Sequence, residues 1–566
     1  VGLGAAEPAG TPAWARPLMP EEDGAPEFPM GSRGTVWPAA AVAGLAFLVY
    51  LASLAPGLSF EHNGTDGGDL IAAAWNLGVP HPTGYPTYTL LAWLFTRLPV
   101  GVVAYRTNLL SAACAAGASG LLFASVRLLL SPGGHAIPAG NDAASGEATT
   151  GPGRGARLRA FVSAHAGVLL AGAAALILAF SSLLWSQAVI TEVYALLTLF
   201  ASLLLWLALR WRAGGGDGLL WLAGLVLGLG LGNHLTLILG APALLLLLWP
   251  ERRRWLRLRV LLPALLSFLA GLGIYAYLPL AARGAPAVNW GNPQTLDRFL
   301  WVVTARQYQQ FAFGLDLAAV PARLATWAGL VGDQFGWWGL ALALAGGAWC
   351  WRRDRAFALC GLAWTLLAGT YAFLYDTGDS QAYLLPPLLI LAAWWAEGAR
   401  GLLRIIGGWR PAWAQPALAL LLLLPIVSLG LHWRAADPDD DWLIHTYIQQ
   451  ALDGVDPGGL VVVRGDGPTF ALWYGLYVED RRPDVSVVSG PLLAYIWYRE
   501  QVRQQVPHLA VPEPGAGEVT IDDLARDLIA ENLPDRPVYA TDPSEAWKEW
   551  FNFQRVEGSP VYRASP

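Results

Sequence analysis

Long apolar segments separated by short polar ones dominate the chain from about residue 36 to residue 433. An α-helix needs about 20 apolar residues to cross the hydrocarbon core of a bilayer. Segments of about this length recur, and the pattern predicts about eleven transmembrane helices. They lie at 36–55, 105–130, 160–183, 192–212, 218–232, 235–250, 258–280, 325–350, 356–375, 383–403 and 414–432. The expected fold class is a polytopic α-helical membrane protein.

Four other features complete the description of the first 433 residues. Residues 1–35 are rich in Pro, Gly and acidic residues without apolar periodicity, so we expect a disordered N-terminal tail. The segment 36–55 is interpreted as a signal anchor, with cleavage near Ala52 as the alternative. Residues 131–159 are expected to form a low-complexity linker. The apolar segment 87–98 has only about 12 residues, which suits a helix lying on the membrane surface.

The composition becomes typical of a soluble protein after residue 433. LVVVRGD (460–466), DVSVVSG and RPVYATD have the character of strands, whereas TFALWYGLYVED and LLAYIWYREQVRQQV have that of helices. This alternation predicts a small α/β domain over 434–566. Its Gly465-Asp466-Gly467 lacks the spacing of a dinucleotide-binding loop, so no nucleotide is inferred.

Composition supports the membrane assignment. The chain is 55% hydrophobic and only 14% charged, and its mean hydropathy is +0.42. Cys114, Cys350 and Cys360 all lie in apolar segments, and the C-terminal domain has no cysteine, so no disulfide framework is expected. The net charge of −6 says little about partners, and no nucleic-acid partner is expected.

Arginine placement predicts the orientation in a cytoplasmic (inner) membrane. If the N-terminus is inside, most arginines fall in cytoplasmic loops, as the positive-inside rule requires. These are Arg154, Arg157, Arg159, Arg210, Arg212, Arg252, Arg253, Arg254, Arg257, Arg352, Arg353, Arg355, Arg400, Arg404 and Arg410. The loops 56–104 and 281–324 and the C-terminal domain then lie outside. Loop 281–324 nevertheless carries four arginines, which could indicate a bound anion.

The first outer loop is the main candidate for chemistry. The stretch 56–88 contains Glu61, Asp66, Asp69 and two histidines, but no Lys or Arg. Asp66 and Asp69 are three residues apart at the start of a predicted helix, so they share one helix face. They could form a general base with a helper. The alternative is an N-cap with an acidic residue in the first turn.

Further polar clusters lie on the same predicted face of the membrane. The turn from His81 to Pro86 is made rigid by two prolines, and its alternative role is only to begin the next helix. Glu192 lies at the head of a span. If its side chain is buried without a partner, the cost in free energy indicates a functional role; the alternative is an acidic residue at a helix N-terminus with access to solvent. His234 lies in the next outer turn, and packing is its default role.

Two more outer segments join this set. Asn289, Trp290, Arg306 and Tyr308 lie in loop 281–324, where the arginine could hold a phosphate or anchor the loop at lipid headgroups. Other candidates lie in the acidic turn after the ninth predicted span, which could also be merely solvated: Asp376, Asp379 and Tyr383. All of these polar clusters fall on the same predicted face of the membrane, which favours a functional role over a chance distribution.

Six stretches in order resemble a known family and cover about residues 40 to 505. They are TDGGDLIAAAWNLGVPHPTGYPTYTLL, LLWSQAVITEVYAL, GLGLGNHLTLI, VNWGNPQTLDRFLWVVTARQY, YDTGDSQAYLLP and GDGPTFALWYGLYVEDRRPDV. The chain resembles bacterial relatives of the transmembrane protein O-mannosyltransferases, formerly a domain of unknown function, in the GT-C class of membrane glycosyltransferases. Asp69 replaces the glutamate usual in that family, and Thr83 replaces a proline.

The resemblance implies a fold, a donor and a reaction. A GT-C enzyme has an N-inside first helix, a catalytic acid in its first outer loop and a polyprenyl-phosphate sugar as donor. We therefore expect transfer of a sugar, with mannose as a candidate, to a hydroxyl of a protein or glycan acceptor outside the membrane, with inversion. A divalent metal is conceivable, although no compact ligand motif demands one. The alternatives are a transporter or flippase of lipid-linked sugars, which would predict repeats and mid-membrane acids, and a sensor anchored by its spans.

Roles can be assigned on this basis. Asp66 would be the general base, and Asp69 would position the acceptor or raise the pKa of Asp66. Arg306, with His234, would stabilise the leaving phosphate. The expected substrate-binding set is His81, Tyr85, Glu192, Tyr194, His234, Asn289, Trp290, Arg306, Tyr308, Asp376, Asp379 and Tyr383.

Overall fold

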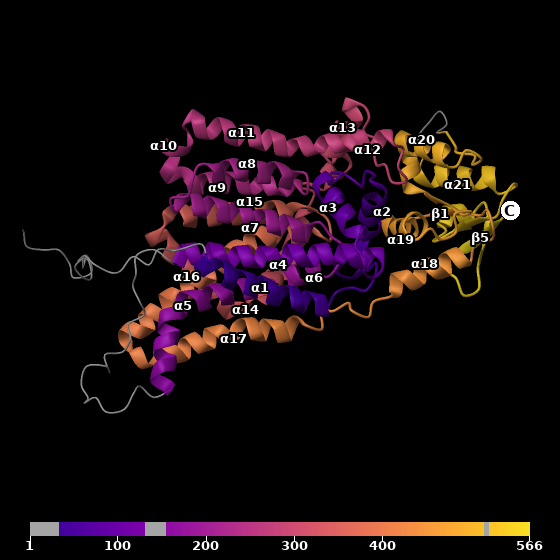
Figure 1. Ribbon diagram of the computed structural model, residues 1–566. Coiled ribbons are helices and arrows are strands. Elements are labelled where there is room, and N and C mark those ends of the chain that lie inside the picture. The colour runs from indigo at the N-terminus through magenta and orange to yellow at the C-terminus, as the bar shows by residue number, and fades with distance from the viewer. Residues whose placement is uncertain (1–32, 131–153, 514–519) are drawn as a thin grey trace, which may run out of the picture.

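The computed structural model describes residues 33–130, 154–513 and 520–566 of the 566-residue chain. The expected disordered tail at 1–35 lies almost entirely outside these ranges, and so does most of the expected linker at 131–159. The described chain forms an elongated helical bundle with a smaller mixed domain at one end (Figure 1).

The long helices of the bundle run along its length (Figure 1). They are α1 (Arg33–Ala52), α4 (Val103–Leu130), α5 (Arg154–Ala179), α7 (Tyr194–Arg212), α8 (Gly218–Leu231), α9 (Gly240–Leu248), α11 (Leu258–Leu272), α14 (Val320–Arg353), α15 (Arg355–Leu374), α16 (Leu385–Trp409) and α17 (Ala414–His432). By length and composition, eight helical segments of the described ranges could cross a membrane, or nine if one bent pair counts as a single span. The prediction of a polytopic helical membrane protein is confirmed.

Each of the predicted spans coincides with helix, but three of them differ from one straight helix of membrane-spanning length. Helix α5 and the short α6 (Ser182–Ala188) meet at a bend of 65°. Helix α8 has only 14 residues. Helix α14 is broken at Gly336, whose φ of 63° lies in the left-handed region. Apolar length predicts where helices lie but carries no information about a bend or a break, so the sequence predicted about eleven spans where eight or nine helical segments are long and apolar enough to cross.

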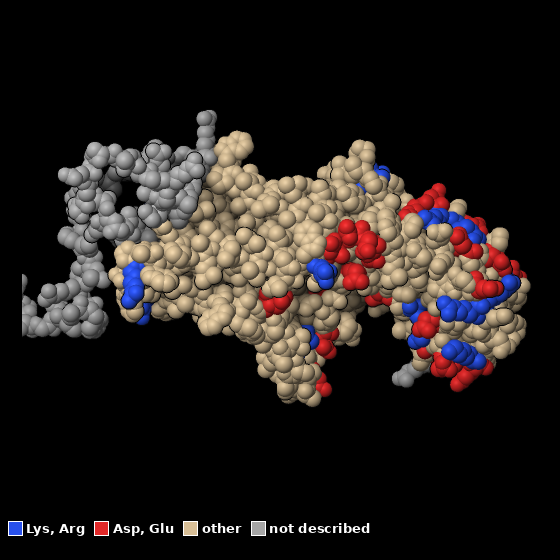
Figure 2. Space-filling model, turned by 90° about the horizontal axis from the view of Figure 1, so that it is seen from below, with Lys and Arg blue, Asp and Glu red and all other residues tan. Residues whose placement is uncertain are grey.

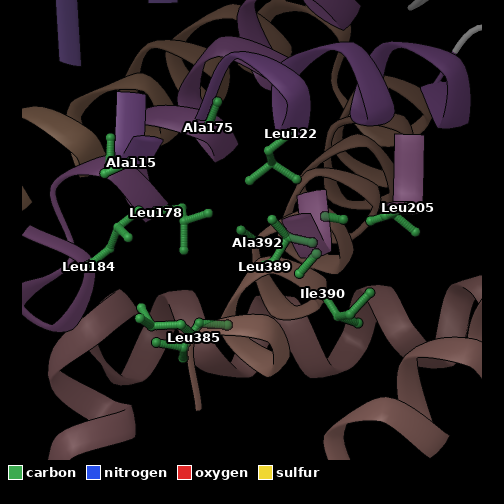
Figure 3. Close-up of a cluster of buried hydrophobic side chains, with 14 of the residues drawn as sticks. Ala115, Leu122, Ala175, Leu178, Leu184, Leu205, Leu385, Leu389, Ile390 and Ala392 are labelled. Atoms are coloured by element: carbon green, nitrogen blue, oxygen red, sulfur yellow. The ribbon is translucent and has the colours of Figure 1, made fainter. Parts of the chain in front are cut away.

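Helix α16 occupies the centre of the bundle. The apolar window of this span is 100% buried, and side chains from α4, α5, α6 and α7 pack around it (Figure 3). Glycines allow α14 to approach it closely, since a Cβ on Gly346 would lie 1.8 Å from the carbonyl oxygen of Trp394. Close packing through small residues is a common way of associating helices in lipid.

Short helices lie between the bundle and the smaller domain (Figure 1). They include α2 (Gly67–Asn76), α3 (Pro86–Thr96), α12 (Tyr277–Arg283) and α13 (Leu296–Val303). Another short helix, α10 (Arg252–Trp255), lies at the end of the bundle away from the C-terminal domain. The expected surface helix at 87–98 corresponds to α3, which has 11 residues and packs against α2 and α4. Its position on a membrane surface stays a prediction.

The C-terminal domain contains a five-stranded sheet in the order β2-β1-β3-β5-β4. Its elements are α18 (Leu443–Asp453), β1 (Leu460–Val463), α19 (Asp466–Tyr477), β2 (Ser486–Ser489), α20 (Ile496–Gln505), α21 (Ile521–Asn532), β3 (Val538–Ala540), α22 (Glu545–Lys548), β4 (Asn552–Arg555) and β5 (Tyr562–Ser565). Strand β1 pairs in parallel with β2 and β3, whereas β5 is antiparallel to β3 and β4. The strands expected from sequence are β1, β2 and β3; the β4–β5 hairpin was missed because its residues are mostly exposed and polar.

Surface charge separates the two parts of the molecule. On the face shown in Figure 2, acidic and basic side chains gather over the C-terminal domain and its junction with the bundle. Further charged side chains lie on the part of the bundle nearer this domain, and the more distant part is almost entirely uncharged until its far end. This is the distribution expected for a bundle surrounded by lipid and a domain surrounded by water.

Candidate functional site

The stretch 56–88 forms one wall of a cavity at the end of the bundle that faces the C-terminal domain. It begins with a 3-10 segment, Glu61–Asp66, in which His62 and Asn63 adopt left-handed φ values of 58° and 64°. Helix α2 follows directly. Asp66 occupies its N-cap position but makes no capping hydrogen bond with its side chain. The alternative of an N-cap with an acidic residue in the first turn thus holds for the positions of Asp66 and Asp69, but the Asp66 side chain does not cap the helix.

Asp69 and His81 form a buried hydrogen-bonded pair. Asp69 Oδ2 accepts hydrogen bonds from the His81 backbone N–H at 2.9 Å and from its ring Nδ1 at 2.7 Å. Asp69 Oδ1 accepts a third from Trp290 Nε1 at 2.9 Å. The other ring nitrogen of His81, Nε2, lies 3.4 Å from Asp66 Oδ2. Thus Asp69 and Trp290 fix the imidazole, and the imidazole faces Asp66.

The two aspartates occupy different environments. The Asp69 side chain is fully buried, whereas that of Asp66 is 40% exposed toward the cavity. Of the two roles expected for Asp69, direct contact with the acceptor is not supported, because the imidazole of His81 and the indole of Trp290 cover its oxygens. Its charge does contribute to raising the pKa of Asp66, as the other role requires. Of the two, only Asp66 lines the cavity.

The same arrangement determines the protonation of the pair. Burial raises the pKa of Asp66 to about 6, against the lowering effect of the His81 charge. Burial alone would lower the pKa of His81, but the carboxylates of Asp66 and Asp69 outweigh it and raise that pKa to about 9. Near neutral pH the pair is therefore a carboxylate beside an imidazolium.

The cavity has a volume of about 500 Å³. It brings together many of the residues singled out from sequence. Those that line it are Asp66, His81, Tyr85, Tyr194, His234, Tyr308, Asp379 and Tyr383. They come from segments up to 317 residues apart, so their convergence is a property of the fold.

The wall toward the bundle is aromatic. The rings of Tyr194, His234 and Tyr383 lie within 5.2–5.9 Å of one another, and the Tyr194 hydroxyl donates a 2.5 Å hydrogen bond to Asp379 Oδ2. Burial lowers the pKa of His234 to about 4, so its imidazole is neutral. A neutral ring brings no charge, so any help from His234 in stabilising a leaving phosphate would have to come from its ring N–H, and this role stays a prediction.

Arg323 holds the turn that carries Asp379. Its guanidinium donates hydrogen bonds to the Tyr375 carbonyl and the Ser380 hydroxyl, each at 2.6 Å. It also lies 3.4 Å from Asp376, whose side chain is 54% exposed. Asp376 does not line the cavity, so its expected place in the binding site is corrected. Its charge faces the arginine instead.

Arg306 also lies outside the cavity lining. Its side chain is 65% exposed, and its nearest acidic group is Asp297 at 4.0 Å. The expected phosphate-binding role is corrected for this reason, although its neighbour Tyr308 does face the cavity. Arg298 pairs with Glu500 of the C-terminal domain at 2.9 Å. No Lys or Arg is found among the residues that line the cavity.

The remaining predicted residues support the walls from behind. Glu192 is buried and does not line the cavity; burial, together with Asp66 and Asp379, raises its pKa well above the usual range. Asn289 is buried beside Trp290, and its amide donates to Asn292 Oδ1 at 3.3 Å. Glu192 and Asn289 therefore lie behind the residues that line the cavity. We expected them to contact the substrate directly, and the structure does not place them where they could.

Sequence reasoning missed several lining residues, above all Asp466 at the start of α19. Gly465-Asp466-Gly467 was considered only as a nucleotide loop. The better signal was that Asp466 is the second residue of the sixth family-like stretch. Tyr371 also lines the cavity and was hidden within an apolar span, whereas Tyr375, another lining residue, begins the fifth family-like stretch. Among the described residues, no group of three or more His, Cys, Asp or Glu side chains is arranged to hold a metal ion.

Comparison with known proteins identifies the relatives of the chain. The family model of the protein O-mannosyl-transferase TMEM260 N-terminal domain matches residues 66–256, and that of TMEM260-associated domain 2 matches residues 444–514. Over these two stretches the chain is similar to the TMEM260 protein O-mannosyl-transferases. The mouse (Mus musculus) TMEM260 protein is 28% identical over 486 residues, covering 79% of this chain and 62% of its own length.

A second TMEM260 relative, from Dictyostelium discoideum, is 22% identical over 536 residues, covering 84% of this chain and 60% of its own length. The chain thus spans about three fifths of the length of these relatives. The first matched TMEM260 domain begins at Asp66 and includes His81 and His234. The second includes Asp466. Both walls of the cavity therefore fall within matched regions.

Solved structures establish the fold. The crystal structure of ArnT from Cupriavidus metallidurans bound to undecaprenyl phosphate superposes with a TM-score of 0.57 at 12% identity, covering 94% of this chain and 98% of that one. The apo structure of the same protein gives a TM-score of 0.55 with the same coverage. The predicted GT-C-like fold is confirmed.

Proposed function

We propose that the chain is a membrane glycosyltransferase that moves a sugar from a polyprenyl-phosphate donor to a hydroxyl of a protein acceptor. The names of its TMEM260 relatives support mannose as the sugar and a protein as the acceptor. The undecaprenyl phosphate bound to ArnT supports the class of donor. The observation that carries the proposal is the cavity in which Asp66, alone of the two outer-loop aspartates, faces open space beside a fixed histidine.

Asp66 acts as the general base in this proposal. Its carboxylate accepts the proton of the acceptor hydroxyl while the hydroxyl oxygen bonds to the anomeric carbon. The bond between that carbon and the phosphate oxygen breaks at the same time, and its electron pair leaves with the polyprenyl phosphate. Attack opposite the leaving group inverts the anomeric configuration.

His81 supplies the positive charge that the mechanism needs. The lining residues include no Lys or Arg, whereas His81 is expected to be an imidazolium at neutral pH. A fixed cation in a secluded site stabilises charge that develops on a leaving phosphate. His81 thus takes the role that the sequence suggested for Arg306. Asp69 and Trp290 are positioning residues, because they act through the imidazole.

The aromatic wall suits the donor sugar. Tyr194, Tyr383 and Tyr85 present ring faces and hydroxyls, and Asp379 accepts a hydrogen bond from Tyr194. Aromatic faces pack against the C–H surfaces of sugars while carboxylates accept from their hydroxyls. These residues lie on the bundle side, from which a lipid-linked donor would enter.

The direct test is turnover of a defined donor. The purified protein in detergent micelles, given undecaprenyl-phosphate mannose and a pool of Ser/Thr-containing peptides, is expected to release undecaprenyl phosphate and to form mannosyl peptides. Mass spectrometry measures both products. A protein that binds the donor without cleaving it would instead fit a transporter and would contradict the proposal.

The proposed orientation places the cavity outside the cytoplasmic membrane. Exposed arginines cluster at the opposite end of the bundle, at α10 and at the end of α14 (Figure 1). The positive-inside rule assigns that end to the cytoplasm. The C-terminal domain and the cavity then face the other side.

A further inference from the structure

Helix α19 closes the cavity from the side of the C-terminal domain. It packs on α2 and on the 3-10 segment that precedes α2. Its Phe470 ring is stacked near the His81 ring, with centroids 6.3 Å apart and an angle of 16° between the planes. The backbones also meet, since a Cβ on Gly68 would lie only 2.3 Å from the Phe470 carbonyl oxygen. The position of α19 relative to Asp66 and His81 is therefore narrowly defined.

Asp466, the first residue of α19, is a carboxylate of the cavity without a hydrogen-bonding partner. It lines the cavity and is exposed to it. Within the described ranges it makes no hydrogen bond or ion pair, although it lies within electrostatic range of His81 and Asp69. Two other acids nearby already accept hydrogen bonds: Asp69 from the imidazole of His81 and the indole of Trp290, and Asp379 from the hydroxyl of Tyr194. Asp466 is free to accept hydrogen bonds from a ligand.

The surroundings of Asp466 indicate which ligand this is. A lipid-linked donor enters from the bundle, whose wall of the cavity is made by Tyr194, Tyr383 and Asp379. Asp466 belongs to the opposite wall, on a domain whose surface is rich in charged groups (Figure 2). A polypeptide acceptor would approach from this water-facing side, and its hydroxyl and backbone N–H groups are donors that a free carboxylate recognises.

We propose that the N-terminal turn of α19 is the acceptor subsite, in which Asp466 binds the hydroxyl-bearing segment of the polypeptide and directs its hydroxyl toward Asp66. The inference rests on the proposed transferase function. It gives the C-terminal domain a direct part in substrate recognition. Water is small enough to reach Asp66 without this contact, so donor hydrolysis does not need Asp466.

The test compares transfer with hydrolysis in the full-length protein. Asp466→Asn removes the charge and keeps the size of the side chain, Asp466→Glu restores a carboxylate, and Asp535→Asn is the matched control. Asp535 is an exposed acid of the same domain that does not line the cavity. Each variant receives undecaprenyl-phosphate mannose with and without the Ser/Thr peptide pool. Free mannose reports hydrolysis, mannosyl peptide reports transfer, and thermal unfolding reports folding.

Asp466→Asn is expected to raise the KM for peptide about tenfold or more, which corresponds to the loss of one charge-assisted hydrogen bond. Transfer to peptide should fall more than hydrolysis in Asp466→Asn, Asp466→Glu should recover part of the transfer, and Asp535→Asn should behave as wild type. An unchanged peptide KM, or an equal fall in hydrolysis and transfer, overturns the acceptor subsite alone. Hydrolysis by the wild type without transfer to any peptide contradicts the peptide acceptor. If the wild type cleaves no donor, the proposed function itself fails, and the subsite with it.

Discussion

At the scale of single residues, two aspartates three positions apart lie in different environments, because the side chain of Asp69 is fully buried and that of Asp66 is 40% exposed. The sequence predicted correctly that Asp66 and Asp69 begin a helix. It could not predict that His81 and Trp290, which lie 12 and 221 residues from Asp69, would cover that side chain and leave Asp66 open. Helical spacing defines which residues share a face but not what packs against each of them.

The protonation of this pair predicts a pH dependence. In the proposed mechanism Asp66 must be deprotonated to accept the proton, and its pKa is about 6, so the rate should rise as the pH increases from about 5 to 7. Loss of the His81 proton, with a pKa of about 9, should lower the rate again above that pH. The measurement is kcat/KM for donor hydrolysis between pH 4.5 and 10. A profile that is flat from pH 5 to 7 would contradict Asp66 as the titrating base.

At the scale of elements, the apolar spans were predictable and their irregularities were not. Apolar length located the helices of the bundle because a helix in lipid must be apolar over its whole length. The bend between α5 and α6 and the break at Gly336 depend on tertiary contacts and backbone conformation. The cavity walls likewise depend on how α2 and α19 approach each other, which residue patterns do not encode.

The contact between α2 and α19 can be tested at Gly68. In Gly68→Ala the new methyl would clash with the Phe470 carbonyl oxygen at 2.3 Å, and overpacking of this kind costs about 1–3 kcal/mol. The variant should unfold at lower temperature in detergent and lose donor turnover. Gly172→Ala is the control, because a Cβ there meets no atom within 4 Å. Equal unfolding temperatures and activities for both variants would show that the contact is not tight.

At the scale of the whole molecule, the cavity proposed as the active site lies between two parts of the chain that sequence reasoning treated separately. The bundle and the C-terminal α/β domain were both predicted, but their meeting at one cavity was not. Asp466 lies 400 residues from Asp66, and nothing in local patterning links positions so far apart. The family-like stretch around Asp466 indicated its importance without indicating its location.

The orientation predicts which cysteine variants can be labelled from outside an intact cell. The native cysteines are all buried, so they provide a low background. Asp535→Cys, in the C-terminal domain, should react with a membrane-impermeant maleimide in intact cells. Arg253→Cys, in the exposed α10 at the other end of the bundle, should react only after lysis. The opposite pattern would place the cavity in the cytoplasm and contradict the proposed sidedness.

The central claim is that Asp66 is the base of a sugar transfer, and the most direct measurement is donor turnover by Asp66→Asn. The purified variant should retain the fold and the unfolding temperature of the wild type but release polyprenyl phosphate at least about 100-fold more slowly, because an amide cannot accept the hydroxyl proton. Asp297→Asn, which changes an exposed acid outside the cavity, is the matched control and should keep wild-type turnover. A folded Asp66→Asn protein with full turnover would contradict the account.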